Sequence, residues 1–339
     1  MVLKFNWFVS KQTQTMADLF ALFSNKETIE KSAPKYSFDE KAKGIIDVLS
    51  LGFGSSVNVR YNNEHHVTNA IERTNTVVVA FSGGKDSVST ALKLKGQGKD
   101  VRLFYVSGIN KSYPDEMKHA KEISSALGLP LHIEYVSQVG KTSFKENPIK
   151  NQVIASMALD YALDNNLGCS IAFGDFTSDN ISNSQFMESW SDTQEMWNAW
   201  VEYVRTYVPN VELIIPFTSY NETLDIISDN KKLLNMVCGC ILPYRFRRKT
   251  KENNESKYGI KLLNNRCGSC WKCCTEYIFL AEKGVVHLDI PFYIHCLDFL
   301  VGKLESVRPD VTVRNRENAY RAFLHREPLE ITKKILRHE

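Results

Sequence analysis

The chain has 339 residues and a formal net charge of +3, from 42 basic and 39 acidic side chains. Hydrophobic residues make up 43% of it, which is ordinary for a globular protein. A charge this close to balance gives no sign of a nucleic-acid-binding surface, and no apolar run approaches the roughly 20 residues of a membrane span. The apolar stretch at the N-terminus is too short for a secretion signal, so we expect a cytoplasmic protein with no membrane contact.

We expect an N-terminal extension over residues 1–75 that is mostly helical. Apolar residues recur at helical spacing in 14–31 and again in 37–52. The extension would serve either as a docking element or as part of a homodimer interface.

From residue 76 onward, short apolar runs alternate with helical patterns. The runs predict strands at 76–81, 100–107, 129–137, 169–174 and 211–217. The patterns between and after them predict helices at 87–98, 114–128, 147–168 and 221–229. This alternation is typical of an α/β fold with a doubly wound, parallel, five-stranded sheet covered on both faces. We assign it to a domain over 76–235, in which ligands would sit beyond the carboxyl ends of the strands.

The first predicted strand ends in an unusual turn, Ser82-Gly83-Gly84-Lys85-Asp86-Ser87. A turn between a strand and the helix after it presents free backbone N–H groups, which bind anions such as phosphate. The two glycines let the backbone come close to a ligand, and the two serines offer hydroxyl donors. Asp86 is suited to hold a magnesium ion, and Lys85 adds positive charge. The turn therefore predicts a phosphate-binding site.

Four of the eight cysteines lie within residues 267–274, and three of them are spaced as in a zinc-binding loop: Cys267, Cys270 and Cys273. A fourth thiolate would complete a tetrahedral site. Cys238, Cys240 and Cys274 are the candidates for it, and we favour Cys240. Because a site with four thiolates has no open position, its zinc ion would be structural.

The remaining C-terminal sequence is expected to surround this metal. We assign 236–290 to a zinc-binding region and 291–339 to a helical extension, with mainly helical structure from residue 275 onward. The highly charged stretch 244–257 is expected to form a linker or loop. The isolated Cys169 and Cys296 are expected in the core.

The Ser-Gly-Gly-x-Asp-Ser turn resembles the pyrophosphate-binding loop (PP-loop) of the ATP pyrophosphatase superfamily. The resemblance implies the HUP fold, that of the adenine nucleotide α hydrolases, with ATP and Mg²⁺ as cofactors. It also implies a reaction in which an oxygen of the substrate attacks the α-phosphate of ATP and pyrophosphate leaves.

Together with the cysteines, the turn resembles the 7-cyano-7-deazaguanine synthase (QueC) family over about residues 76–290. Pro148 and Asn151 match the family's Pro-x-Arg-Asn segment, and the stretches GDFTSD and WSDTQ resemble two further family motifs. In that family the carboxylate of 7-carboxy-7-deazaguanine is adenylated and converted by ammonia to an amide, which a second ATP dehydrates to a nitrile.

The resemblance implies roles for individual residues. ATP and Mg²⁺ would be held by Ser82, Gly83, Gly84, Lys85, Asp86, Ser87, Val106 and Gly174. Catalytic roles would fall to Lys85, Asp86, Asn151, Asp179 and Asp192. The zinc ligands would be Cys240, Cys267, Cys270 and Cys273.

The sequence also departs from the family pattern. Lys85 stands where an apolar residue is usual, Lys150 replaces an arginine, and Thr193-Gln194 replaces a Cys-Arg pair. With the additions at both ends, these departures resemble relatives in antiphage (CBASS) systems, which implies coupling of the deazaguanine carboxylate to a protein amine and a stop at the amide. The expected partners are the deazaguanine and an acceptor protein such as a CBASS nucleotidyltransferase, with ammonia kept as the other acceptor.

Two other functions fit parts of the sequence. A tRNA thiolase of the same superfamily has the same loop with lysine, and its cysteines hold an iron–sulfur cluster or carry sulfur. The chain shows no basic stripe beyond 244–251, which counts against tRNA binding. A zinc-containing binding module without activity is the third function, and it would have no use for Asp86.

Overall fold

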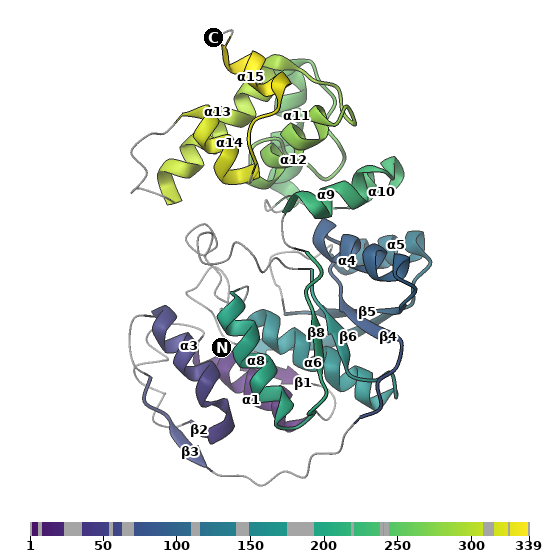
Figure 1. Ribbon diagram of the computed structural model, residues 1–339, viewed down its shortest axis with the longest axis vertical. Helices are drawn as coiled ribbons and strands as arrows, with labels where there is room; N and C mark the ends of the chain where they lie inside the picture. The colour runs from purple at the N-terminus through teal and green to yellow at the C-terminus, as the bar shows by residue number, and fades with distance from the viewer. Residues whose placement is uncertain are drawn as a thin grey trace.

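The computed structural model describes residues 2–5, 9–23, 36–53, 57–62, 71–109, 116–139, 149–174, 193–217, 220–237, 240, 244–307, 315–324 and 326–337. It contains a six-stranded sheet in the order β1-β6-β5-β4-β7-β8, which lies in the lower part of the view in Figure 1. Its strands are β1 (Val2–Phe5), β4 (Thr76–Ala80), β5 (Asp100–Ser107), β6 (Leu131–Val139), β7 (Ser170–Ala172) and β8 (Glu212–Ile214). The parallel pair β2 (Ser37–Asp39) and β3 (Arg60–Asn62) forms a second, small sheet.

The helices fall into three groups along the chain. The N-terminal group is α1 (Lys11–Leu22), the short 3₁₀ helix η2 (Glu40–Ala42) and α3 (Lys43–Phe53). The strands of the large sheet alternate with or precede α4 (Lys85–Gly96), α5 (Glu116–Leu127), α6 (Lys150–Asp164), α8 (Gln194–Arg205), α9 (Tyr220–Ser228) and α10 (Lys231–Met236). The C-terminal group is α11 (Tyr244–Tyr258), α12 (Trp271–Glu282), α13 (Ile290–Val307), α14 (Arg316–Leu324) and α15 (Glu330–Arg337). Within the described ranges, no helix has the length and apolar character needed to cross a membrane.

The strand order places β4 at a special point of the sheet. From β4 the chain moves to β5 and β6 on one side, then returns to β7 and β8 on the other side, all in parallel. Connections therefore leave the carboxyl ends of β4 and its neighbours in opposite directions. In doubly wound sheets this switch point opens the crevice in which ligands bind.

Both faces of the sheet are buried, and alternate residues of each strand serve the two faces. Val78 and Ala80 of β4 join one core with α1, α3, α6 and α8. Val77 and Val79 join the other core, which contains residues of α4, α5 and α9 and continues into α12, α13 and α14. The predicted α/β fold with a parallel sheet covered on both faces is thus confirmed.

The sequence prediction of five strands is wrong by one. β1 pairs antiparallel with β6, from Val2 opposite Val139 to Phe5 opposite Val136, and so forms a sixth strand at the edge. The residues after β1 are also anchored in the main body, since the Ser10 backbone N–H donates to Asp160 Oδ2 at 3.0 Å. The N-terminal residues therefore help to build the large core instead of forming a layer outside it.

The charged stretch 244–257 is a helix and not the expected linker. α11 contains neither glycine nor proline, and oppositely charged side chains lie one turn apart along it. Arg248 contacts Glu252 at 2.9 Å, and Lys251 contacts Glu255 at 3.5 Å. Such pairs support an exposed helix by about 0.3–0.5 kcal/mol each. α11 to α15 gather at one end of the molecule, with α9 and α10 between them and the sheet (Figure 1). The mainly helical C-terminal part is as predicted.

Candidate phosphate site and metal centre

The turn after β4 leaves the sheet through a tight bend. The Phe81 N–H still donates to the Phe104 carbonyl of β5 at 2.8 Å, and the chain then turns at once into α4. Gly83 adopts a φ of +73°, which L side chains rarely adopt. A Cβ atom there would also lie 3.2 Å from the Cα of Ala120 in α5. Glycine is therefore required by the backbone conformation and by the close approach of α5.

The N-terminus of α4 has no side-chain cap. Gly84 is the N-cap residue. Because glycine has no side chain, this cap makes no side-chain hydrogen bond to the first N–H groups of the helix. The hydroxyl groups of the turn hold its shape instead. Ser82 Oγ accepts from the Gly84 N–H at 3.3 Å, and Ser87 Oγ donates to the Gly84 carbonyl at 3.1 Å. The turn presents the positive end of a helix dipole, where anions bind.

Burial alternates along the turn. Ser82, Gly84 and Asp86 are partly exposed, whereas Gly83, Lys85 and Ser87 are buried. The backbone therefore divides the motif into an open side and an inner side, and Asp86 shares the open side with the first serine.

Lys85 lies on the inner side, with only 1% of it exposed. Its Nζ is ion-paired with Asp86 Oδ1 and donates to Thr223 Oγ1 of α9 at 3.3 Å. Burial lowers the pKa of Lys85 to about 8, although the nearby carboxylates of Asp86 and Glu276 favour its charged form. The Lys85 ammonium thus lies against α9 and orients the Asp86 carboxylate from the buried side of the turn.

Gly174 directly follows β7 and packs against the beginning of α4. A Cβ atom on it would lie 2.5 Å from the Asp86 carbonyl carbon and 2.7 Å from the Ser87 nitrogen. These are backbone atoms that cannot turn away. Gly174 therefore lets the end of β7 pack closely against the start of α4, and its predicted role in nucleotide binding stays a prediction.

The structure says less about the other four predicted site residues. Val106 lies at the carboxyl end of β5, 5% exposed in the core on the α6 side. Asn151 lies in the first turn of α6, a helix whose N-terminus also has no side-chain cap. Asp179 and Asp192 lie outside the described residues. The proposed roles of all four remain predictions.

Sequence reasoning missed Glu116, the first residue of α5. Tyr105 of β5 donates its hydroxyl to Glu116 Oε2 at 3.4 Å. Burial raises the pKa of Glu116 to about 7, and the Lys150 charge opposes this shift. A carboxyl group that titrates near neutrality is suited to proton transfer. Its position after a strand was visible in the sequence, but an acidic residue in a first helical turn is too common to identify a site.

The cysteine cluster brings together four buried thiols, from Cys240, Cys267, Cys270 and Cys273. All their sulfur atoms lie within 4.8 Å of one another, and the sulfurs of Cys240 and Cys270 are 3.9 Å apart. Four thiolates around one tetrahedral zinc ion are separated by about 3.8 Å, given zinc–sulfur bonds of about 2.3 Å. The cluster could therefore bind one metal ion, and Cys240 lies where we predicted the fourth ligand.

Backbone N–H groups fix the thiols in place. Cys270 is the N-cap residue of α12, and its sulfur accepts from the Cys273 N–H at 3.5 Å. The Ser269 N–H donates to the Cys267 sulfur at 3.3 Å. Hydrogen bonding from Cys240 and the other cluster thiols holds the pKa of Cys270 well below its usual range. The N–H contacts orient the sulfurs of Cys267 and Cys270, as hydrogen bonds to metal-binding thiols commonly do.

Cys274 lies outside this cluster, although it is adjacent to Cys273. Its sulfur points toward the Gly268 carbonyl at 3.7 Å, and burial raises its pKa well above the usual value. It belongs to the same apolar core as Cys296. Cys169 and Cys296 are buried as predicted, and Cys238 lies outside the described residues.

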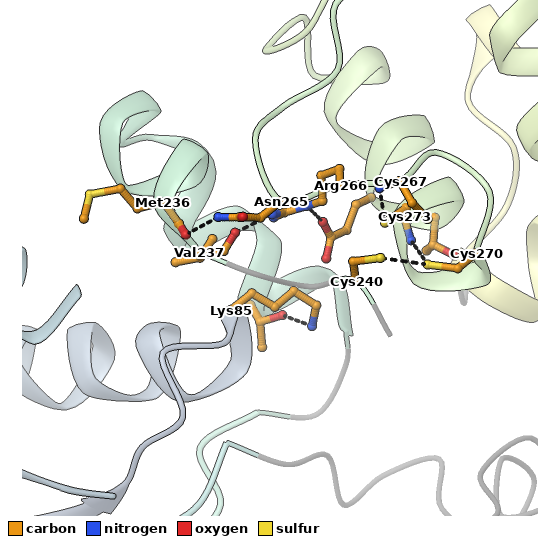
Figure 2. Close-up of polar contacts among 12 residues, drawn as sticks. Lys85, Met236, Val237, Cys240, Asn265, Arg266, Cys267, Cys270 and Cys273 are labelled. Atoms are coloured by element: carbon orange, nitrogen blue, oxygen red, sulfur yellow. Dashed lines mark hydrogen bonds and ion pairs between the residues drawn. The ribbon is translucent and has the colours of Figure 1, made fainter. Parts of the chain in front are cut away.

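A buried ion pair connects the metal centre to the body of the protein. Arg266, next to Cys267, forms a charged pair with Glu276 of α12, and both side chains are at most 4% exposed. Arg266 also donates through Nη1 to the Val237 carbonyl, beside the end of α10 (Figure 2). The neighbouring Asn265 donates to the Met236 carbonyl at 3.0 Å. The loop that carries three of the cysteines is thereby anchored to α10, close to the helices around Lys85.

Comparisons with known proteins add little to this geometry. No family model matches the chain, and no curated protein matches it. A predicted subunit of a tRNA methyltransferase from Methanocaldococcus jannaschii aligns over 45% of this chain and 74% of its own, at 20% identity and a TM-score of 0.29. NMN synthetase from Francisella tularensis aligns over 81% of this chain and 98% of its own, at 11% identity and a TM-score of 0.31. Both TM-scores are too low for these similarities to support an inference about the function of this chain.

Proposed function

We propose that this chain is an ATP-dependent carboxylate–amine ligase of the PP-loop type, related to 7-cyano-7-deazaguanine synthase. One observation carries the proposal. The Ser82–Ser87 turn joins a strand at the switch point of a parallel sheet to a helix with no side-chain cap, and Gly174 lets the end of the neighbouring strand β7 pack closely against the start of that helix. This is the arrangement in which backbone N–H groups bind a phosphate chain.

The residues of the turn have different parts in this proposal. The first N–H groups of α4 and the Ser82 hydroxyl would hold the β- and γ-phosphates of ATP, and Asp86 would hold Mg²⁺. ATP would supply an adenylyl group, which converts a carboxylate into a mixed anhydride that an amine can attack. Lys85 would keep Asp86 in place through their ion pair. Glu116, the first residue of α5 and the hydrogen-bond partner of Tyr105 in the neighbouring strand β5, is a candidate base for the attacking amine.

The proposed substrate is 7-carboxy-7-deazaguanine, and the proposed acceptor is a protein amine, with ammonia as the other possibility. The matches at Asn151 and Gly174 and the Cys267–Cys273 loop support the first part. The helices that continue beyond the cysteine cluster support the second, since they add surface that an enzyme using only ammonia does not need. A CBASS nucleotidyltransferase is the proposed acceptor protein.

The geometry of the cysteines counts against a tRNA thiolase. All four sulfurs lie within 4.8 Å of one another, which suits one tetrahedral ion and leaves no cluster thiol to carry sulfur. An iron–sulfur cluster with several irons would hold its thiolates farther apart. The metal centre is accordingly proposed to be structural zinc.

The proposal is tested by incubating the purified protein with ATP, Mg²⁺ and 7-carboxy-7-deazaguanine and measuring AMP. We expect AMP and pyrophosphate to form only when the carboxylate is present. Mass spectrometry then identifies the product, either the free amide or nitrile or an acceptor protein that has gained one acylated base. Absence of carboxylate-dependent AMP would rule out the ligase. A brown protein absorbing near 400 nm would instead support the thiolase.

A further inference from the structure

A pocket of about 420 Å³ is separated from the phosphate-binding turn by His119 of α5, and it is lined mainly by polar residues. Its walls come from α5, α10, α11 and the segment at 264–265 that precedes the cysteine loop. None of these residues was predicted to bind a ligand. The pocket exists because 244–258 is a helix, which carries its charged side chains over α5 and α10.

Basic side chains outnumber acidic ones in the lining of the pocket, where Arg247, Arg248 and Lys251 of α11 face the single carboxylate of Glu122. Arg248 and Lys251 also pair with Glu252 and Glu255 of the same helix, which lowers the net positive charge. Arg247 and Lys251 are four residues apart and therefore lie on the same face of the helix. Glu122 is paired in the same way, since its Oε1 lies 3.9 Å from Lys118 Nζ. Such a surface attracts a multivalent anion, and arginine is especially suited to phosphate oxygens because it can donate two parallel hydrogen bonds.

His119 connects this pocket to the turn. It lines the pocket, and its Cδ2 lies 3.3 Å from the position of a Cβ on Gly83. Its Nε2 is buried and has no hydrogen-bond partner within the described ranges. Burial, reinforced by the charges of Arg247 and Arg266, lowers the pKa of His119. A neutral imidazole with a free ring nitrogen therefore lies between the turn and the basic face of α11.

We propose that this pocket is a second anion site, which receives the pyrophosphate that leaves ATP. The inference rests on the proposed function, and it assigns to α11 a role that the turn does not have. When a carboxylate oxygen forms its bond to the α-phosphorus, the bond from that phosphorus to the bridging oxygen breaks. The bridging oxygen keeps the electron pair, so the departing pyrophosphate gains negative charge. Arg247, Arg248 and Lys251 then bind the pyrophosphate after it has left the turn.

The test measures direct binding of magnesium pyrophosphate to the full chain by calorimetry. We expect Arg247→Gln and Lys251→Gln each to weaken binding by about tenfold, because each removes one charged phosphate contact. Lys249→Gln is the matched control, since Lys249 is exposed on the same helix and does not line the pocket; it should change the affinity less than about twofold. Arg247→Lys keeps the charge and should recover part of the loss. Binding of AMP should be the same in all variants.

The outcomes separate this inference from the proposed function. If the pocket variants bind pyrophosphate as well as Lys249→Gln does, the inference is wrong, even if carboxylate-dependent AMP forms. If they lose pyrophosphate affinity but the chain forms no AMP with the carboxylate, the anion site stands and the ligase proposal fails. If the variants lose affinity for bulk tRNA while pyrophosphate binding is unchanged, the pocket is a nucleic-acid contact and the inference is again wrong.

Discussion

The turn after β4 and the cysteine cluster before α12 both gather polar groups at the N-terminus of a helix, but they use them in opposite ways. At α12 the Cys270 sulfur caps the helix, and four buried thiols face one another. At α4 no side chain caps the helix, and Ser82, Gly84 and Asp86 are partly exposed. A closed set of ligands stabilises the fold, whereas an open set of donors is available to a ligand. The contrast supports the proposal that the cysteine cluster has a structural role and that the turn binds the ligand.

The largest effect is expected when one thiol is removed from the cysteine cluster. Cys240→Ala removes one of the four thiols and leaves the metal with an incomplete site. We expect the bound metal to fall from one per chain to near none, with a loss of about 5 kcal/mol in the free energy of unfolding. Elemental analysis and urea unfolding measure the two quantities.

Cys274→Ala is the matched control for this change. Cys274 is equally buried but belongs to the apolar core. It should keep the metal and lose only the modest stability that goes with a small cavity. Equal metal content in both variants would show that Cys240 is not a ligand.

A somewhat smaller effect is expected at the open site. Asp86→Asn retains the shape of the side chain but removes the charge proposed to hold Mg²⁺. We expect the rate of AMP formation to fall by about 10³-fold, equivalent to about 4 kcal/mol in the transition state, while the metal content is unchanged. A stopped assay with a fold check by circular dichroism measures this. A folded variant with the wild-type rate would show that the turn is not the site of chemistry.

These two sites were predictable from the sequence to different degrees. The spacing of Cys267, Cys270 and Cys273 already indicates a metal centre, because metal geometry is local. The partner Cys240 and the excluded Cys274 became distinguishable only when the fold placed their sulfurs. The turn was predictable as a motif, but the inward direction of Lys85 was not, because Thr223 and Glu276 approach it from distant parts of the chain.

The strands and helices were also predictable from the sequence to different degrees. Strands β4 to β8 were predicted because each lies in a short, mainly apolar stretch next to a helical pattern. β1 was missed because it has only four residues and is stabilised by pairing with β6, far along the chain. α11 was missed because its stability comes from charged pairs such as Arg248–Glu252, which a hydrophobic pattern does not reveal.

Lys85 lies where the open turn meets the buried interior, and the pH dependence of stability tests how fully it is buried. In the folded chain burial lowers its pKa from 10.5 to about 8. Between these values the unfolded chain binds more protons, so Lys85 makes the wild type more stable as pH rises from about 8 to about 10.5. Below this range both states are protonated, and the full cost of the buried ammonium remains.

Lys85→Met lacks this titration. The free energy of unfolding of the wild type, relative to the variant, should therefore rise by up to about 3 kcal/mol across that range. Urea unfolding of both proteins at a series of pH values measures the difference, and tyrosine titrations common to both cancel. A difference that does not change with pH would mean that Lys85 is solvated, and Lys249→Met at an exposed position should show this flat behaviour.

The smallest effect, and the most specific to the geometry of the open site, is expected at Gly174. Gly174→Ala would place a methyl group 2.5 Å from the Asp86 carbonyl carbon, so the start of α4 has to move. Overpacking of this kind costs about 1–3 kcal/mol, and displaced N–H groups should raise the KM for ATP by more than the loss of stability would suggest. Gly302→Ala in α13 is the control, since among the described residues nothing beyond its own stretch of helix lies within 4 Å of the added methyl group, and alanine there should stabilise the helix slightly. If Gly174→Ala lowers stability but leaves the KM for ATP unchanged, then β7 packs against the turn without shaping the nucleotide site.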